Sequence, residues 1–350
     1  MRIFLALLAL ALFAACANRQ GPAPEHYTVL RTYGWESTVS APQAEWNPAS
    51  YMVLARAAGG FALLDEGGGK QIYYGSSEGR VMSDAVWLSP TQFVFGPERN
   101  VIRTADGTVV PSSEGLMLVK VHDGRQPEIT TLSQAGWRPR PWGETVICQV
   151  ADTIQQVDTS GRMQEFGRGF NPEPQPKGQG ICWMDKPVLE PDYWTATPGL
   201  GQLVIRWRPG QITTIPAAVE ARWTVDGGVV ATVLRAAPPT GGPWWSAGTE
   251  LVYCSGPGAK PVVIASEVHA PAPHPQVDLV AATANDGRLV LIDLGGRPQA
   301  VLADQGERPR WSADGVRLLA EEPLIAEAGK QKDAMIYLRV YVLSTTAVAK

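Results

Sequence analysis

The sequence predicts an all-β fold, a seven-bladed β-propeller, on three observations. The 350 residues include 36 glycines and 29 prolines, a composition that favours many turns and few long helices. A pattern of an apolar anchor, a short polar turn and an apolar strand recurs seven times. One glycine hairpin lies between each successive pair of these anchors. The spacing of the copies is typical of propeller blades.

Tryptophan marks most of the repeated anchors. The clearest copy runs from Trp311 to Ala320, and weaker copies begin at Trp46, Trp87, Trp142, Trp183 and Trp223. A degenerate copy near His274 has lost its tryptophan. The seven starts are 37 to 55 residues apart, with a mean of about 44, which is the length of one propeller blade.

Glycine-centred turns alternate with the anchors. They begin at Gly79, Gly124, Gly161, Gly210, Gly258 and Gly296, and glycine supplies the positive φ that a tight hairpin needs. Six turns between seven anchors leave the last blade one strand short. At the N-terminal end of the chain, the strand-like segment 27–33 precedes the first anchor and belongs to no complete blade. We therefore predict that it pairs with the C-terminal strand at 336–343, which closes the ring and removes an open sheet edge.

The anchor at Trp311 resembles the W-S-P-D-G-x-x-L-A-F repeat of the TolB-like propellers. Residues 311–320 match that pattern nearly throughout, with Ala313 in place of the proline. The resemblance covers residues 27–346 as architecture, and it implies a fold rather than an activity. Known TolB has six blades, so a six-bladed ring is the alternative. In that case the degenerate copy at His274 would not be a blade.

The N-terminus predicts secretion and a lipid anchor. Met1 and Arg2 give a short basic start, and residues 3–15 form an uncharged apolar run that is too short to span a bilayer and is typical of a signal peptide. The segment Phe13-Ala14-Ala15-Cys16 resembles the bacterial lipobox, although Phe13 stands where that pattern prefers leucine. A plain secretory signal is the alternative interpretation.

The resemblance to the lipobox implies that Cys16 carries the lipid. Ala17 replaces the aspartate that retains enterobacterial lipoproteins at the inner membrane, so we expect the outer membrane, on the periplasmic side rather than the cell surface. The expected organisation is a signal peptide at 1–15, a lipidated tether at 16–26, the propeller at 27–346 and a tail at 347–350. Beyond the signal peptide, no segment approaches 18 uncharged apolar residues, so only the lipid would hold the body to the membrane.

Charge and motifs argue against several function classes. The formal net charge of −4 is unlike the basic face of a nucleic-acid binder. The segment 75–79 satisfies G-x-S-x-G, but no helical pattern follows it, so a polar hairpin is the better interpretation than a hydrolase nucleophile. Cys254, His269 and His274 lack the fourth ligand of a structural zinc site. We therefore expect no catalytic residues, no metal and no cofactor.

Three cysteines remain if Cys16 carries lipid. Cys148 and Cys254 lie in strand-like segments, where a cysteine usually acts as a small buried apolar residue. An oxidising periplasm leaves open a disulfide between Cys148 and Cys182.

Aromatic residues outside the repeat supply the candidate binding site. Tyr193, Trp194, Trp244 and Trp245 lie in or beside stretches rich in proline and glycine. Loops of that kind run over the surface, and exposed tryptophans often supply the main binding energy of protein interfaces. The alternative is that these side chains fold inward and plug a blade face.

These observations predict a non-catalytic binding or scaffold lipoprotein of the outer membrane, with a protein partner in the cell envelope. One alternative is a periplasmic enzyme, a lyase or hydrolase, whose site lies in the central funnel of the propeller. Another is a capture or adhesion lipoprotein at the cell surface. An enzyme should gather His, Asp, Glu or Arg side chains at one mouth of the ring, whereas a scaffold should present an apolar or aromatic patch.

Overall fold

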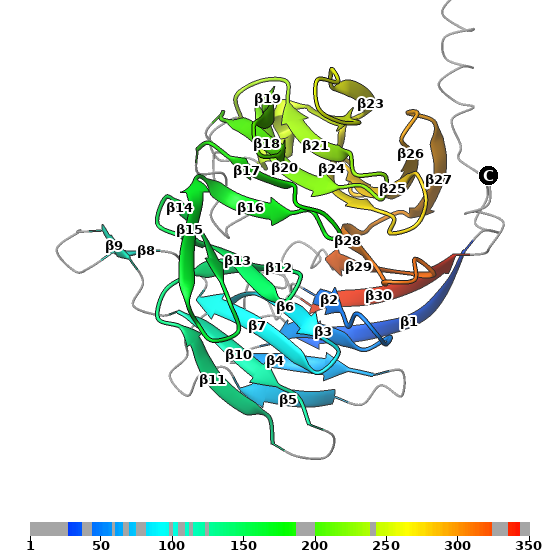
Figure 1. Cartoon of the computed structure of the whole chain (residues 1–350). Helices are drawn as coiled ribbons and strands as arrows, with labels where there is room; N and C mark the ends of the chain where they lie inside the picture. The colour runs from blue at the N-terminus through cyan, green and yellow to red at the C-terminus, as the bar shows by residue number, and fades with distance from the viewer. Residues whose placement is uncertain are drawn as a thin grey trace, which may run out of the picture.

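The computed structural model describes residues 27–36, 44–57, 60–65, 70–74, 82–97, 101–103, 109–111, 115–122, 126–186, 200–238, 243–323 and 335–343. Within these residues, seven four-stranded antiparallel sheets make up the fold (Figure 1), and β8 (Val101–Arg103) and β9 (Val109–Pro111) form a separate two-stranded sheet. One 3-10 helix, η2 (Trp244–Ala247), precedes β22.

The first strand of each sheet is its inner strand. The inner strands are β2 (Ala44–Trp46), β6 (Met82–Ser89), β12 (Trp137–Trp142), β16 (Phe170–Pro174), β20 (Ala218–Trp223), β24 (Val268–Pro273) and β28 (Glu307–Trp311). The second strands are β3 (Val53–Ala57), β7 (Gln92–Pro97), β13 (Thr145–Val150), β17 (Ile181–Met184), β21 (Val229–Leu234), β25 (Leu279–Ala284) and β29 (Arg317–Pro323).

The third and outer strands complete each sheet. The third strands are β4 (Gly60–Leu64), β10 (Leu116–Lys120), β14 (Thr153–Val157), β18 (Gln202–Arg208), β22 (Thr249–Cys254), β26 (Leu289–Asp293) and β30 (Met335–Leu343). The outer strands are β5 (Lys70–Tyr74), β11 (Glu128–Ser133), β15 (Met163–Arg168), β19 (Gln211–Pro216), β23 (Val262–Ser266), β27 (Pro298–Ala303) and β1 (Tyr27–Glu36).

The inner strands follow one another around a ring. β2 contacts β6, β6 contacts β12, and the series continues through β16, β20, β24 and β28 back to β2. Four-stranded sheets arranged around a common axis by their first strands are the architecture of a β-propeller. The predicted all-β propeller is therefore confirmed.

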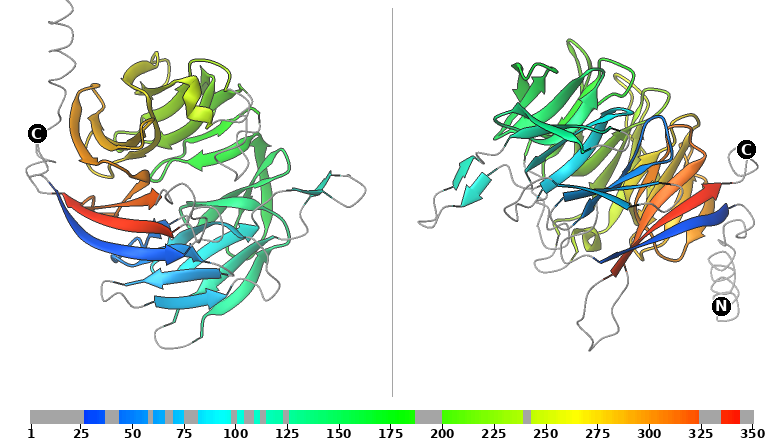
Figure 2. Two further views of the ribbon diagram at one scale, coloured as in Figure 1. Left: turned by 180° about the vertical axis from the view of Figure 1, so that it is seen from behind. Right: turned by 90° about the horizontal axis from the view of Figure 1, so that it is seen from below.

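The two ends of the chain share one sheet, as the leftover N-terminal strand predicted. β1 pairs antiparallel with β30, from Tyr27 opposite Leu343 to Glu36 opposite Met335. Figure 2 shows the blue N-terminal strand beside the red C-terminal one. The order β28-β29-β30-β1 thus makes the last sheet from both ends of the chain. No edge of β30 is left open, because β1 covers it.

The anchor tryptophans of three inner strands tie neighbouring sheets together. The indole Nε1 of Trp46 donates to the carbonyl oxygen of Arg310 at 2.9 Å, that of Trp223 to Glu173 at 2.9 Å and that of Trp311 to Ala272 at 2.8 Å. In each case the acceptor lies on the preceding inner strand, one residue before the anchor of that strand. The anchors are therefore at the same level in successive sheets.

Three of the predicted anchors were misplaced. Trp183 lies on the second strand β17, and the inner strand of that sheet is β16, which ends at Pro174. Trp142 and His274 each lie one residue after the anchor position, because the equivalents of Trp223 are Pro141 and Pro273. Proline is apolar and suits the end of an inner strand, so these copies keep the geometry of the repeat while losing its tryptophan.

The turn of the clearest copy is closed by side chains. Ser312 donates its hydroxyl to the Asp314 carboxylate at 2.6 Å, and the same carboxylate accepts from the backbone nitrogen of Val316 at 3.0 Å. Tyr51, from the turn after β2, donates its hydroxyl to Asp314 at 2.5 Å. These hydrogen bonds lower the pKa of Asp314. The turn therefore also connects the last sheet to the first.

Four of the predicted glycine hairpins join the third and outer strands of their sheets. Gly161, Gly210, Gly258 and Gly296 have φ values of 84°, 80°, 75° and 84°, a region that favours glycine. Gly79 and Gly124 lie outside the described residues.

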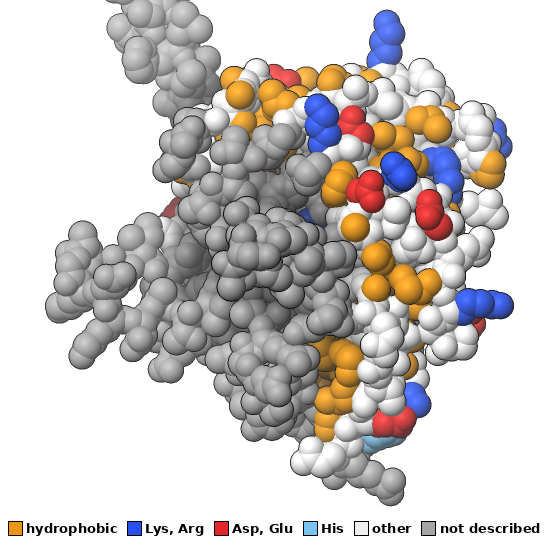
Figure 3. All heavy atoms as spheres, turned by 90° about the vertical axis from the view of Figure 1, so that its left-hand side faces the viewer, with side chains coloured by type: hydrophobic (Ala, Val, Ile, Leu, Met, Phe, Trp, Pro, Cys, Tyr) orange, Lys and Arg blue, Asp and Glu red, His pale blue; other side chains and the backbone are white. Residues whose placement is uncertain are grey.

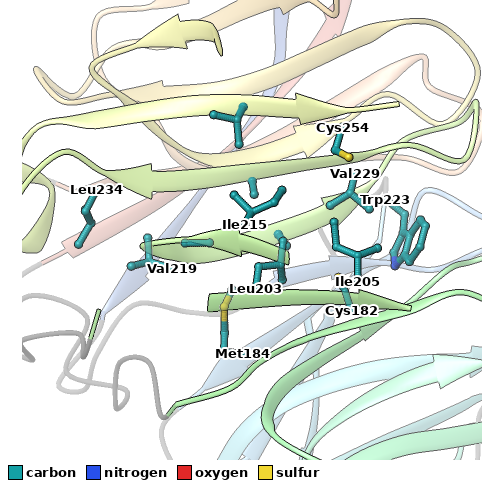
Figure 4. Close-up of a cluster of buried hydrophobic side chains, with 14 of the residues drawn as sticks. Cys182, Met184, Leu203, Ile205, Ile215, Val219, Trp223, Val229, Leu234 and Cys254 are labelled. Carbon is teal, nitrogen blue, oxygen red and sulfur yellow. The ribbon is translucent and has the colours of Figure 1, made fainter. Parts of the chain in front are cut away.

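The core lies between adjacent sheets. Figure 4 shows one cluster, in which Cys182, Leu203 and Ile205 of one sheet lie near Trp223 and Val229 of the next. Full burial of such side chains contributes about 1.5–3 kcal/mol each to folding. Cys148, Cys182 and Cys254 are buried and free, so the disulfide left open between Cys148 and Cys182 is not formed. Burial raises the pKa of the Cys148 thiol to about 12, which makes it unreactive.

Candidate functional site

One position on each inner strand forms what we call the axial ring. It is the residue immediately before the anchor, and its seven members are Glu45, Val86, Arg140, Glu173, Arg222, Ala272 and Arg310. The indole hydrogen bonds described above fix the register of this position between neighbouring strands. Since the inner strands surround the axis of the propeller, the partly exposed members of this ring border that axis.

The three arginines of the axial ring share one conformation. In each, Nη1 donates to the carbonyl oxygen of the preceding residue: Arg140 to Pro139 at 2.9 Å, Arg222 to Ala221 at 2.8 Å and Arg310 to Pro309 at 2.9 Å. A guanidinium held by its own backbone loses less conformational entropy when it binds a further partner. The ring therefore holds three arginines in prepared positions.

Glu173 is shared by two of these arginines. Its Oε2 accepts from Arg140 Nε at 3.1 Å and lies 3.4 Å from Arg222 Nη1. The three residues come from the consecutive inner strands β12, β16 and β20, and their side chains are 21 to 31% exposed. We call this set the arginine ladder, in which the guanidiniums of Arg140 and Arg222 share one oxygen of Glu173.

A second ion pair joins two further members of the axial ring, Arg310 and Glu45. Arg310 Nε lies 3.3 Å from Glu45 Oε1, and this pair links the inner strand of the last sheet to that of the first. Their side chains are 26% and 39% exposed. The two remaining ring members, Val86 and Ala272, are buried and apolar. The ring therefore carries charged residues at five of its seven positions.

A buried charged cluster lies beside the ring in the last sheet. Glu321 on β29 is 4% exposed and pairs with Arg308 Nη2 at 2.5 Å. Burial raises the pKa of Glu321 to about 7, although Arg308 and Arg310 oppose the shift. Burial also raises the pKa of Glu307, which faces Glu321 across the strand pair. A carboxyl that exchanges a proton near neutral pH is a candidate general acid or base.

The backbone of Arg308, a member of this cluster, has an unusual conformation. Arg308 has φ 47°, and Arg138 and Asn171 occupy the same left-handed region at 50° and 51°. All three lie at irregularities where the inner strand slips against its neighbour. Ala270 has φ 50° at the corresponding irregularity of β24, so the left-handed residue is a repeated feature of the inner strands.

The tryptophan pair predicted to bind a partner is buried. Trp244 is fully buried and Trp245 is 8% exposed. Their rings meet edge to face with centroids 5.6 Å apart, and His269 stacks on Trp245 at 4.7 Å. Of the two alternatives for these loop tryptophans, the inward-folded one is therefore found, because they belong to the apolar cluster of β20–β22 and contact His269 of β24. Tyr193 and Trp194 lie outside the described residues.

His269 and His274 have structural roles. His269 Nδ1 lies 3.1 Å from Asn285 Oδ1. His274 Nδ1 accepts from the backbone nitrogens of Gln276 and Val277 at 3.1 and 3.2 Å, so its Nε2 donates to the Gly315 carbonyl at 3.0 Å. Burial lowers the pKa of both imidazoles. Within the described ranges, no group of three or more His, Cys, Asp or Glu side chains is arranged to hold a metal ion.

The described surface offers no single apolar face to replace the buried tryptophans. Ile212, Val262 and Val263 are 49 to 60% exposed, but they lie on the outer strands β19 and β23. Figure 3 shows one side of the molecule, where apolar and charged side chains alternate over the described part. Across the described residues, no helix is both long and apolar enough to cross a membrane. The cysteine expected to carry lipid and the G-x-S-x-G segment lie outside the described residues.

Comparison with known proteins identifies the fold. No family model and no curated protein matches the chain. Among solved structures, it is similar to a streptogramin B lyase, with 10% identity, a TM-score of 0.55 and coverage of 90% of this chain and 99% of the other. It is also similar to YCF48 bound to D1 peptide, with 11% identity, a TM-score of 0.54 and coverage of 92% and 99%.

A virginiamycin B lyase from Staphylococcus aureus gives a similar result, with 10% identity, a TM-score of 0.53 and coverage of 89% and 99%. At these identities the likeness establishes the fold and leaves the activity open. The neighbours combine lyases with a peptide-bound protein, so they agree on a β-propeller and on nothing more specific.

Proposed function

We propose that this chain is a non-catalytic binding protein that takes its partner at the axis of the propeller. The observation that carries the proposal is the axial ring, where the arginine ladder and the Arg310–Glu45 pair are partly exposed on the innermost strands. Propellers bind mainly around the central channel or through loops at one face. A similar propeller, YCF48, was solved with a bound peptide, which supports this use of the fold.

We infer that each four-stranded sheet is one blade, which gives a ring of seven. The closed series of contacts among seven inner strands supports this number over six. The sheet that begins with β24, which ends one residue before His274, has four strands like the others.

We further propose that the protein is anchored in the bacterial outer membrane through a lipid on Cys16, with its body in the periplasm. The support is the sequence of residues 1–26, in which an uncharged apolar run ends in Phe13-Ala14-Ala15-Cys16. The segment 16–26 would then serve as a tether. A capture protein on the cell surface uses the same anchor in the opposite orientation.

Replacing the proposed lipid-bearing cysteine tests both the attachment to the outer membrane and the capture of a partner at that membrane. The variant Cys16→Ser should move the protein from the membrane fraction to the soluble fraction or leave it unprocessed, because a serine cannot form the thioether. A partner that co-purifies with the wild-type protein from outer membranes should no longer do so. A variant that stays in the membrane fraction with its partner would contradict the anchor, and Cys254→Ser is the matched control that should behave as wild type.

A periplasmic enzyme remains the second candidate, because one observation favours it. Charged side chains gather on the inner strands, and Glu321 has a pKa of about 7, which suits proton transfer at neutral pH. Glu321 is only 4% exposed, so a lyase or hydrolase could use it as acid or base only if its substrate reached the buried pair with Arg308. The ion pair at 2.5 Å between these two residues also has a purely structural explanation, and the binding role is therefore preferred.

A further inference from the structure

We propose that the arginine ladder binds an acidic peptide segment, whose carboxylate competes with Glu173 for Arg140 and Arg222. This inference rests on the proposed binding function and specifies its ligand. A guanidinium and a carboxylate match in shape and charge, and two parallel hydrogen bonds can form between them. Within the ladder, both guanidiniums contact the same carboxylate oxygen of Glu173.

The internal carboxylate is held loosely enough to be displaced. Both arginines contact the same oxygen of Glu173, and the contact with Arg222 is long at 3.4 Å. A carboxylate from a ligand that takes the place of Glu173 leaves neither guanidinium without a negatively charged partner, so the exchange avoids the cost of an unpaired buried charge. Exchange of Glu173 for the carboxylate of a ligand therefore costs the fold little.

The arginines themselves are prepared for the exchange. Arg140 and Arg222 keep their hydrogen bonds to Pro139 and Ala221 whether or not Glu173 is present, because those acceptors belong to the backbone. Among the described residues, Arg222 donates through Nη1 alone, whereas a guanidinium has five N–H groups. The remaining donors of Arg222 are available to an incoming carboxylate.

The composition of the axial ring favours a peptide segment as the source of the carboxylate. Arg310 and Glu45 form a second charged contact point on the same ring, and Val86 and Ala272 are apolar. A peptide can place carboxylates and apolar side chains at separate points along its length, which a small inorganic anion cannot. The excess of three arginines over two glutamates on the ring also attracts an acidic chain.

The test measures binding of a fluorescein-labelled peptide of alternating glutamate and alanine to the full-length protein in detergent micelles. Wild type should bind it at least about tenfold more tightly than the same peptide with glutamine in place of glutamate. Arg222→Gln should weaken binding about tenfold, and Glu173→Gln should strengthen it severalfold because the internal competitor is gone. Arg235→Gln is the control, since Arg235 is 43% exposed and pairs with Glu250 and Glu267 away from the axial ring.

Three outcomes would overturn the proposal. Equal losses in Arg222→Gln and Arg235→Gln would indicate nonspecific attraction, and unchanged or weaker binding by Glu173→Gln would mean that the carboxylate of Glu173 is not displaced. Full displacement of the peptide by equimolar inorganic phosphate would identify a small-anion site instead. Melting curves must show that each variant is folded, and Arg222→Lys, which keeps the charge, replaces Arg222→Gln if the latter is not. If the peptide fails to bind while the cellular partner still cross-links to the axial ring, this inference is wrong and the proposed function stands.

Discussion

Deleting residues 27–36 is expected to lower the melting temperature by roughly 10 °C or more and to cause aggregation. The deletion removes the outer strand β1, which pairs with β30 over nearly its whole length. Without it, the last sheet keeps three strands and the backbone groups of β30 become an open edge. An exposed edge of this length pairs readily with other chains.

A protein that begins at residue 27 is the matched control, because it lacks residues 1–26 but keeps β1. Its melting temperature, followed by circular dichroism, should be close to that of the full chain. A synthetic peptide of residues 27–36 added to the deleted protein should restore part of the lost stability. Equal melting temperatures for the deletion and the control would mean that β1 does not complete the ring.

The free energy of unfolding is expected to fall as the pH rises from 5 to 8, by about 2–3 kcal/mol more in wild type than in Glu321→Gln. Glu321 has a pKa of about 7 in the folded protein, against an ordinary value of 4.5. Between these values the unfolded chain releases a proton that the folded chain keeps, so unfolding becomes easier with rising pH. The effect is absent below about pH 4.5 and complete above about pH 7.

Urea unfolding at several pH values measures this difference. Glutamine has nearly the shape of glutamate and cannot ionise, so the variant isolates the titration of one side chain. Parallel pH profiles for the two proteins would contradict the buried charged cluster. A steeper fall in the variant than in wild type would show that the shift of the pKa has the opposite sign.

Much of the fold could be predicted from the sequence because the repeat is set by local chemistry. Trp46, Trp223 and Trp311 occupy the predicted anchors, and their indoles make the same hydrogen bond to the preceding sheet. The error at Trp183 has a physical origin. An apolar strand that follows a turn looks the same whether it is the inner strand or the second, and Pro174 carries no signal as strong as tryptophan.

The candidate site could be predicted much less well. Composition drew attention to Trp244 and Trp245, but burial depends on the space between β20–β22 and β24, which a sequence does not display. The axial ring was not predicted from the sequence, although the sequence contains a pattern that marks part of it. The segments Arg138-Pro139-Arg140 and Arg308-Pro309-Arg310 repeat one pattern before two anchors. Only the ring closure shows that these arginines border the same axis as Glu173.

We expect the partner to bind at the axis of the propeller rather than on the outer strands. Photo-cross-linking in cells tests it most directly, with p-benzoylphenylalanine placed either at Glu45 on the axial ring or at Val262 on the outer strand β23. Glu45 is 39% exposed and Val262 is 60% exposed, so both positions accept the larger side chain. We expect a covalent adduct with an envelope protein from position 45 and none from position 262. An adduct from position 262 alone would contradict it.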